Sequence, residues 1–332
     1  MQDLIVSGVK ALLRLLLRGY FKELRHTRRD IPKEGPLVFL ANHQNALLDA
    51  LLIAAFNRRK TFFLVRSNLF KNRVVARFLY FFGLRPIYRI RDGREKLALN
   101  DPLFDFFAQV LVQGHCVLLF PEGNHALQRT VRPLRKGFIE IIDRAYAIAP
   151  HLSLRIVPVG LSYQQPSCFF DRVAIQYNPS LDAAELFLNQ QDQKLRDKRI
   201  LDRVHAELCS ATVHIPKESY DEIIAVLGTK AIDFTQVQRV NQEIEKRLKE
   251  ETEGGTKRMS LSLPEAVCTY SAAQRYLLLL AWPVTFLWRL IVKPRIKEAE
   301  FISTFRFAYF TLWVTLIALM ASFLLLYLLI LK

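Results

Sequence analysis

Short apolar runs alternate with helix-like segments over residues 36–178, and this alternation limits the chain to one class of fold. Each run is bounded by turn residues, which is typical of a buried strand. Strands that alternate with helices form a mostly parallel sheet with helices on its faces, so the sequence predicts an α/β domain. The predicted strands are 36–41, 61–66, 84–89, 116–120, 154–160 and 173–177, and the predicted helices are 49–56, 69–82, 101–113 and 137–149.

A polar segment, Asn-His-Gln-Asn-Ala-Leu-Leu-Asp at residues 42–49, follows the first predicted strand. Open α/β folds place their sites at the carboxyl ends of strands. His43 can act as a base near neutral pH, and Asp49 is the nearest carboxylate downstream. Six helical residues turn through about 600°, so the two side chains can meet only if His43 lies in a loop and Asp49 in or near the next helix. Asn45 is a candidate cap for that helix. The alternative is an ordinary loop histidine beside a surface acid.

The charge balance indicates an anionic partner. The chain carries 47 lysine and arginine residues against 31 aspartate and glutamate residues, a formal net charge of +16. Such a surface suits nucleic acid, anionic lipid or an acidic carrier protein. The apolar residues concentrate at the two ends of the chain, which favours a membrane and argues against a soluble nucleic-acid binder. The four cysteines have neither metal-ligand spacing nor a disulfide framework, so we expect a reducing compartment, no disulfide and no metal.

Residues 1–25 combine an apolar stripe with basic side chains at four-residue spacing, namely Lys10, Arg14, Arg18 and Lys22. This pattern predicts a helix that lies in a membrane interface. The alternative is an amphipathic helix docked on the protein's own core. A signal peptide is not expected, because an uninterrupted apolar core and a small-residue cleavage site are both missing. We therefore expect an interface helix over residues 1–30 and an α/β domain over 31–180.

The C-terminal part contains two further apolar segments, at residues 276–292 and 307–331. The second is long enough to span a bilayer, whereas Pro283 and Arg289 interrupt the first. Basic residues between them favour a cytoplasmic loop, which would leave the first segment re-entrant or interfacial; a hairpin with both ends cytoplasmic is the alternative. Residues 181–260 are charged and helix-prone, so we expect a helical extension and linker there and membrane segments over 261–332.

Four features of the α/β domain, in this order, resemble the glycerolipid acyltransferases, the family of glycerol-3-phosphate and 1-acylglycerol-3-phosphate acyltransferases. They are the His43 to Asp49 block, the Gly83 to Arg89 block, Phe120-Pro121-Glu122-Gly123, and Val157-Pro158-Val159. Phe-Pro-Glu-Gly after a strand is the most specific of the four. The resemblance covers residues 36–160 and implies the acyltransferase fold of that family.

The resemblance also implies roles for individual residues. His43 and Asp49 would be catalytic, and Arg89 would bind the phosphate of the acceptor. Glu122 and Gly123 would lie in the acceptor site. The supporting residues would be Asn42, Gly83, Phe120 and Pro121, with Val157 and Pro158 on the acyl side or in the site wall.

Two departures from the family pattern concern the acceptor. Most members have four residues between the histidine and the aspartate, whereas this chain has five, as a subgroup of the family does. Most members also continue Phe-Pro-Glu-Gly with threonine or serine and then arginine. Asn124 and His125 stand there instead, so the phosphate role of that arginine is vacant. Arg129, Arg132 and Lys136 are the candidates to fill it.

Acyl transfer to an alcohol requires a base near the hydroxyl. His43 can take the proton while Asp49 fixes its tautomer. No serine lies in a nucleophile-elbow context, so the acceptor hydroxyl is expected to attack a thioester directly. A phosphorylated acceptor explains the arginines, because guanidinium binds phosphate in a fork geometry.

The sequence therefore predicts a membrane-bound acyltransferase of phospholipid synthesis. It would use acyl-CoA or acyl carrier protein and 1-acylglycerol 3-phosphate, with no cofactor. We expect it in a bacterial inner membrane or equivalent, with its site facing the cytoplasm. The alternatives are glycerol 3-phosphate or another lysolipid as acceptor, and a non-catalytic membrane-binding scaffold on the same fold.

Overall fold

The structure, a computed structural model, describes residues 2–27, 31–57, 59–88, 94–188, 192–229, 232–254, 271–272, 275–276, 279 and 281–330. Its centre is one sheet with the strand order β1-β7-β6-β2-β5-β3-β4, and a short β8 also pairs with β6. The strands are β1 (Glu23–Thr27), β2 (Leu37–Ala41), β3 (Thr61–Arg66), β4 (Leu84–Ile87), β5 (Cys116–Leu119), β6 (Arg155–Tyr163), β7 (Arg172–Tyr177) and β8 (Leu181–Asp182). Neighbours are parallel except β6 with β7 and β6 with β8. The predicted α/β class with a largely parallel sheet is confirmed.

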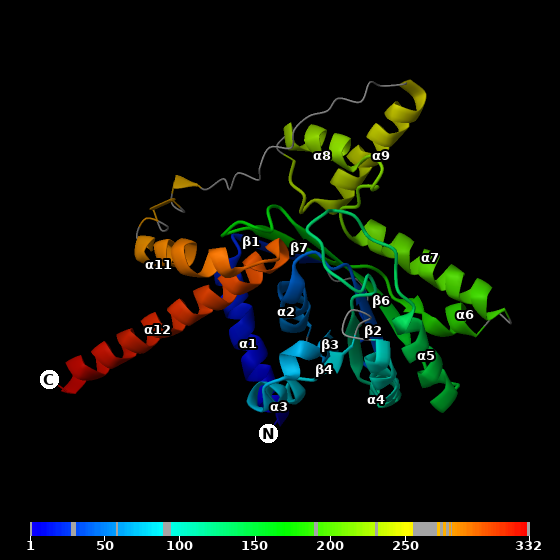
Figure 1. Ribbon diagram of the computed structural model, residues 1–332, viewed down its shortest axis with the longest axis horizontal. Coiled ribbons are helices and arrows are strands. Elements are labelled where there is room, and N and C mark those ends of the chain that lie inside the picture. The colour runs from blue at the N-terminus through cyan, green and yellow to red at the C-terminus, as the bar shows by residue number, and fades with distance from the viewer. Residues whose placement is uncertain are drawn as a thin grey trace.

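Helices cover both faces of the sheet (Figure 1). Alternate residues of a strand face opposite sides, and in β2 this sends Val38 and Leu40 to one core and Leu37 and Phe39 to the other. The first core lies under α4 (Asp101–Val112), α5 (Gly137–Ile148), α6 (Ala183–Phe187) and α7 (Gln193–Ala211), and the second under α1 (Gln2–Tyr20) and α2 (Ala46–Phe56).

The remaining helical elements connect or extend this framework. They are η1 (Ser67–Phe70), α3 (Arg73–Phe81), η3 (Arg94–Asn100), α8 (Tyr220–Thr229) and α9 (Val237–Gly254), followed by α11 (Trp282–Leu287), η4 (Trp288–Val292), η5 (Lys293–Arg295), η6 (Ala299–Phe301) and α12 (Ile302–Ile330). Helices α8 and α9 pack around a small core of their own. The prediction that residues 182–250 are mainly helical is confirmed.

The N-terminal helix ends earlier than the sequence predicted. Helix α1 stops at Tyr20, and residues 23–27 form strand β1, which pairs with β7 at one edge of the sheet. An edge strand with one covered face has little apolar patterning, so the segment Glu-Leu-Arg-His-Thr gave no strand signal.

The cysteines differ from the sequence prediction at one position. Cys168 is disulfide-bonded, so the prediction of no disulfide is wrong for this residue, whereas Cys116 and Cys209 are free.

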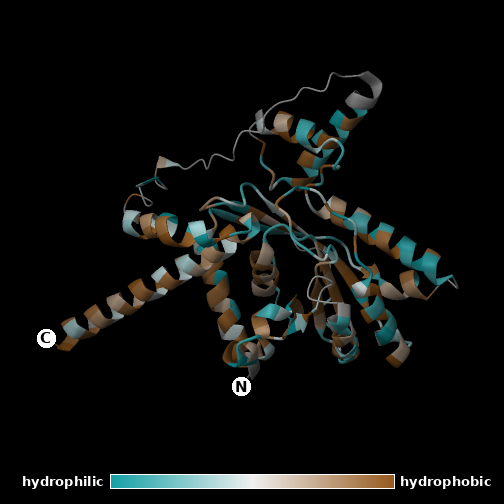
Figure 2. Cartoon of the chain, viewed as in Figure 1, coloured by the Kyte–Doolittle hydropathy of each residue, from teal (hydrophilic) through white to brown (hydrophobic). Residues whose placement is uncertain are grey.

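Among the described residues, one helix is long and apolar enough to cross a membrane, Ala299–Ile330. Figure 2 shows it as a mostly hydrophobic rod that leaves the domain. Its first turns belong to the core: the Tyr20 hydroxyl donates to the Ser303 carbonyl at 3.3 Å, and the Phe307 ring packs edge-on to Tyr20 at 5.3 Å. The described part of the earlier apolar segment, from Trp282 to Val292, is too short to span.

Candidate active site

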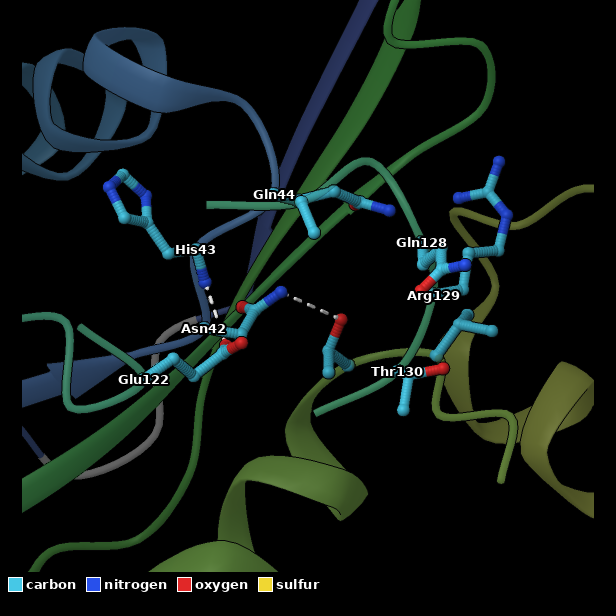
Figure 3. A pocket seen from close by; sticks show the side chains of 10 residues that line it. Asn42, His43, Gln44, Glu122, Gln128, Arg129 and Thr130 are labelled. Carbon is cyan, nitrogen blue, oxygen red and sulfur yellow. Dashed lines mark hydrogen bonds between the residues drawn. The ribbon is translucent and has the colours of Figure 1, made fainter. Parts of the chain in front are cut away.

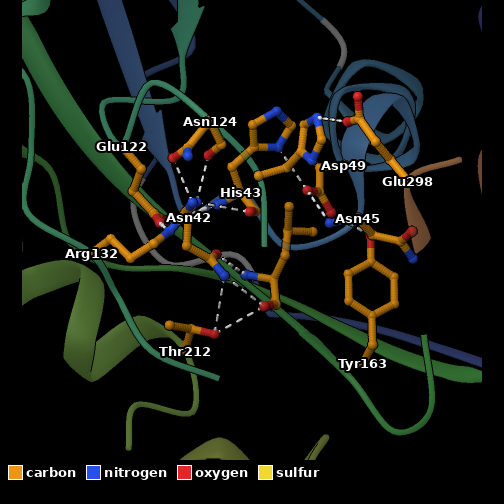
Figure 4. Close-up of polar contacts among 12 residues, drawn as sticks. Asn42, His43, Asn45, Asp49, Glu122, Asn124, Arg132, Tyr163, Thr212 and Glu298 are labelled. Carbon is orange, nitrogen blue, oxygen red and sulfur yellow. Dashed lines mark hydrogen bonds and ion pairs between the residues drawn. The ribbon is translucent and has the colours of Figure 1, made fainter. Parts of the chain in front are cut away.

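His43 lies in the loop between β2 and α2, and Asp49 lies in the first turn of α2. His43 Nδ1 and Asp49 Oδ2 are 2.9 Å apart (Figure 4). The Asp49 side chain is fully buried, whereas that of His43 is 16% exposed. The prediction that the pair meets through a loop and the following helix is confirmed. No hydrogen-bond partner of His43 Nε2 lies in the described part of the chain, so this nitrogen is open to a ligand.

Two further donors fix the Asp49 carboxylate. The backbone N–H of Asn45 donates to Oδ2 at 2.7 Å, and the Tyr163 hydroxyl donates to Oδ1 at 2.6 Å. A buried carboxylate requires such partners. Burial, together with the charge of Asp49, raises the pKa of Tyr163 well above its usual range, so the phenol stays protonated and keeps donating.

The expected cap by the Asn45 side chain is wrong. Neither polar atom of its amide has a hydrogen-bond partner within the described residues, although the residue is only 1% exposed. The Asp49 carboxylate accepts the N–H at the start of α2 instead. A helix N-terminus favours a negative charge, so α2 stabilises the carboxylate that orients His43.

Glu122, at the end of the adjacent strand, holds the loop that carries His43. Its Oε1 accepts the backbone N–H of His43 at 3.0 Å, and its Oε2 accepts from Arg132. Arg132 also donates to the His43 carbonyl at 3.2 Å and to Asn124 Oδ1 at 2.5 Å. Burial raises the pKa of Glu122, and the positive charge of Arg132 opposes this shift. Both residues thus support the loop, and each Glu122 oxygen accepts a hydrogen bond from it or from Arg132; a contact of Glu122 with the acceptor stays a prediction.

Asn42 and Phe120 also position the His43 loop, Asn42 through hydrogen bonds to β6 and Phe120 through contact with the imidazole ring. The Asn42 amide accepts the Leu161 N–H at 2.7 Å and donates to the Leu161 carbonyl at 3.0 Å, which ties the end of β2 to β6. It also donates to Thr212 Oγ1 at 3.4 Å. The Phe120 ring stacks on the His43 imidazole with 4.0 Å between centroids. The imidazole is therefore held between a flat apolar surface and Asp49.

A small cavity lies beside the loop that carries His43 (Figure 3). Its volume is about 10 Å³, which is room for about one water molecule. The residues that line it include Asn42, Glu122, Arg129 and Thr212. Figure 3 shows the His43 imidazole turned away from this cavity, so the open nitrogen faces another side of the loop.

Of the candidate phosphate ligands, Arg132 contacts the His43 loop, whereas Arg129 and Lys136 make their contacts with other parts of the domain. The Arg129 guanidinium donates to the carbonyls of Tyr163 at 2.7 Å and Gln164 at 2.9 Å and lies over the Phe234 ring. These contacts connect the end of β6 to the segment that contains Phe234. Lys136 pairs with Asp197 at 3.0 Å. Arg129 is thus occupied by backbone carbonyls, whereas the Lys136 side chain remains 61% exposed; phosphate binding by either residue stays a prediction. Arg89 lies outside the described residues.

The other predicted supporting residues shape the backbone. Gly83 and Gly123 both have positive φ, +79° and +78°, and close the turns after α3 and β5. The Pro121 carbonyl accepts the Arg135 N–H at 2.7 Å. Val157 and Pro158 are buried in β6 opposite Phe39 and Leu40 of β2, within the sheet and before its carboxyl edge. Their predicted place on the acyl side or in the site wall stays a prediction.

Sequence reasoning missed Tyr163 and Thr212. Tyr163 shares the inward face of β6 with Val157, Val159 and Leu161, so extending the predicted strand past residue 160 would have found it. Thr212 follows α7 and has no such signal. The close approach of α7 to the sheet depends on Gly160, where a Cβ atom would lie 1.8 Å from the Ala211 carbonyl oxygen.

A second missed group lies at the edge of the site. The His125 ring is edge-on to His43 with centroids 5.5 Å apart, and Arg66, the last residue of β3, contacts His125 Nε2. Glu298, just before η6, lies 3.7 Å from both Arg66 and His125. His125, Glu298 and Glu300 offer ligand atoms within 4.8 Å of one another, but the Arg66 guanidinium already supplies a positive charge there. The residues that lead into α12 thus form one wall beside His43.

The fold and the site together define a class: an α/β domain with an aspartate-oriented histidine at the carboxyl edge of its sheet. Residues 24–162 match the family model described as Acyltransferase. This part of the chain belongs to that family and is an acyltransferase domain of the glycerolipid type.

Three relatives illustrate the match. The chain is 27% identical over 125 residues to an uncharacterized acyltransferase of Schizosaccharomyces pombe, covering 37% of this chain and 18% of that protein. It is 28% identical over 131 residues to a 1-acyl-sn-glycerol-3-phosphate acyltransferase of Chlamydomonas reinhardtii (39% and 35%). It is 23% identical over 130 residues to glycerol-3-phosphate O-acyltransferase 1 of Saccharomyces cerevisiae (38% and 17%). The matches therefore span only 17 to 35% of these relatives.

Proposed function

We propose that this protein is a membrane-bound O-acyltransferase of phospholipid synthesis. It transfers a fatty acyl group from acyl-CoA or acyl carrier protein to the free hydroxyl of 1-acylglycerol 3-phosphate and forms phosphatidate. The observation that carries the proposal is the 2.9 Å contact between His43 Nδ1 and a fully buried Asp49 within an acyltransferase-family domain. A membrane-binding scaffold would need neither side chain.

The reaction follows from the open nitrogen of His43. Nε2 takes the proton of the acceptor hydroxyl as its oxygen attacks the thioester carbonyl. Asp49 stabilises the imidazolium that forms and keeps Nδ1 protonated. When the tetrahedral intermediate collapses, the ester C–O bond remains, the C–S bond breaks, and the imidazolium returns the proton to the leaving thiolate. No covalent acyl-enzyme is required.

An anionic acceptor suits the charges at the edge of the site. Arg66 ends β3 beside His125, and Ile87 of β4 is its partner in the parallel register. Both strands therefore end at the same edge of the sheet. Arg89 follows β4 by two residues, and we assign it to the phosphate of the acceptor, where a guanidinium fork gives two parallel hydrogen bonds.

Membrane attachment fits both substrate and product, which are lipids. The helix Ala299–Ile330 is the anchor in this proposal, with none of its most apolar window buried against the protein. Because η6 begins this helix and packs beside His125, the site would lie close to one bilayer surface. The basic residues at the base of the helix favour the cytoplasmic side, and a bacterial inner membrane or its equivalent is the proposed location.

Glycerol 3-phosphate is the second candidate acceptor, since one of the relatives is named for that substrate. The deciding assay offers labelled acyl-CoA, or acyl carrier protein, to the purified full-length protein with each acceptor in parallel. We expect labelled phosphatidate, with a rate lowered at least about a hundredfold in His43→Ala, the usual scale of lost base catalysis. Equal rates for the unsubstituted protein and His43→Ala would refute His43 as the base. No transfer to any acceptor would favour the alternative of a non-catalytic membrane-binding scaffold.

A further inference from the structure

Helix α3 (Arg73–Phe81) presents its apolar side chains to the outside of the protein. None of its residues is buried. Val74 is 79% exposed and Phe78 is 62% exposed. The helix is also well capped, because the Asn72 side chain accepts the N–H groups of Val74 and Val75. A stable helix with an uncovered apolar face indicates a surface that is covered in the working protein.

The apolar and basic side chains of α3 lie on separate faces. At about 100° per residue, Val74 and Phe78 fall in one stripe, while Arg73 and Arg77 fall in a neighbouring stripe. Lys71 adds a third cation just before the helix. Separate apolar and basic faces are typical of a helix that lies in the interfacial plane of a membrane.

We propose that α3 lies in the surface of an anionic bilayer, with Val74 and Phe78 among the acyl chains and with Lys71, Arg73 and Arg77 at the headgroups. The charge pattern favours lipid over a second copy of this chain. Two copies of α3 placed face to face would bring their basic side chains together, which is unfavourable. Anionic headgroups instead attract each such cation with about 1 kcal/mol.

Helix α1 offers a second exposed apolar surface. Lys10 of α1 donates to the Arg59 carbonyl at 2.8 Å, and the Gly83 carbonyl that follows α3 accepts the Phe63 N–H at 3.0 Å. Both helices therefore meet the protein at the start of β3. Helix α1 also exposes Leu4, Leu12 and Leu15, at 78%, 56% and 68%, so α1 and α3 would enter the same bilayer surface.

Contact between α3 and the bilayer would bring lipid close to the proposed active site. The chain passes from Arg66 at the site edge directly into η1 and then α3. Seating α3 in the headgroup region would thus fix the edge of the sheet against the membrane, where a lysolipid acceptor resides. The placement of lipid near the active site rests on the proposed function, whereas the contact of α3 with the bilayer does not.

The experiment places an environment-sensitive fluorescent amino acid at Phe78 of the full-length protein. The matched control places it at Leu195 of α7, which is 54% exposed on another helix. The proteins are reconstituted in vesicles of phosphatidylcholine with phosphatidylglycerol that contain lipid spin-labelled about 5–10 Å below the headgroups, the depth reached by interfacial helices. We expect a blue-shifted emission and at least about twofold quenching at position 78, and water-like emission without quenching at position 195.

Water-like, unquenched emission at position 78 would overturn the proposal. So would quenching that depends on a spin label on a second copy of the protein and not on the lipid. A second measurement uses Val74→Asp with Phe78→Asp: transfer to long-chain lysophosphatidate should fall about tenfold in these vesicles, where the helix must dock, and remain unchanged in detergent micelles. An equal loss in both would refute a docking role in catalysis. Because fluorescence needs no turnover, an inactive protein would still give a clear answer on the contact.

Discussion

The backbone N–H of His43 donates to Oε1 of Glu122 at 3.0 Å, so the loop after β2 is held by the loop after β5. The two strands are parallel neighbours with Leu40 opposite Leu119. Their carboxyl ends therefore meet, and one carboxylate can bridge the loops that follow. The glutamate of the Phe-Pro-Glu-Gly motif thus contacts the histidine loop through the backbone N–H of His43.

Glu122→Gln should lower kcat about tenfold and leave the KM of either substrate nearly unchanged. The amide keeps an acceptor for the His43 N–H but loses the charged contact with Arg132, and a hydrogen bond between charged groups contributes about 1.5–3 kcal/mol. Steady-state kinetics test this, with Glu140→Gln on the exposed side of α5 as the control. A raised acceptor KM at unchanged kcat would instead place Glu122 in the binding site.

Tyr163→Phe should also reduce kcat about tenfold, because the buried Asp49 carboxylate loses a charge-assisted donor. Tyr146→Phe is a matched control: the Tyr146 residue is 6% exposed and its hydroxyl has no partner among the described residues. The control should keep full turnover. Equal kinetics for the two variants would show that the contact with Asp49 does not matter to catalysis.

Arg129→Met should lower Tm without changing the acceptor KM. The substitution keeps an apolar stem over Phe234 but leaves the carbonyls of Tyr163 and Gln164 without their donor, and each unsatisfied buried group costs about 1–3 kcal/mol. Thermal unfolding and steady-state kinetics, measured together, separate the two roles. A specific increase of the acceptor KM at unchanged Tm would restore Arg129 to the phosphate site.

Arg89→Lys should raise the KM for a phosphorylated acceptor about tenfold, equivalent to about 1.4 kcal/mol, because lysine keeps the charge but loses the fork. The KM for the acyl donor should stay the same. An equal increase for both substrates would indicate a structural arginine. No change would leave Arg66 as the cation to test next.

Asp171 should make the protein less stable as the pH rises from about 4 to 7. Burial raises the pKa of this carboxyl to about 7, so above the unfolded value of 3.8 the folded state holds a proton that the unfolded state releases. Asp171→Asn keeps an acceptor for the Gln165 and Arg172 N–H groups and should flatten this dependence of Tm. The exposed Asp202→Asn should not; a slope unchanged in Asp171→Asn would refute the assignment.

Local rules predicted the parts of the site that are set by short spacing. The five residues between His43 and Asp49 require a loop followed by a helix, and the structure has both. The partners that fix the pair come from farther away, and the sequence gives no spacing for them. Tyr163 reaches Asp49 from β6. Arg129 contacts the carbonyls at the end of β6 and the Phe234 ring, which lie far from it in the sequence. Asn45 has a residue type that favours a cap, but its side chain makes no cap hydrogen bond, and its own N–H donates to Asp49 instead.

The packing of Ser303 and Phe307 against Tyr20 joins the proposed membrane anchor to the interior of the acyltransferase domain. Cutting the chain near residue 256 would therefore uncover the Tyr20 ring and would also remove Glu298 from beside His125. The shortened protein would aggregate rather than behave as a soluble catalytic fragment. A soluble variant of this protein would have to keep the first turns of α12, which pack against Tyr20. Polar substitutions would begin at about Leu312, from where most large apolar side chains of α12 are exposed.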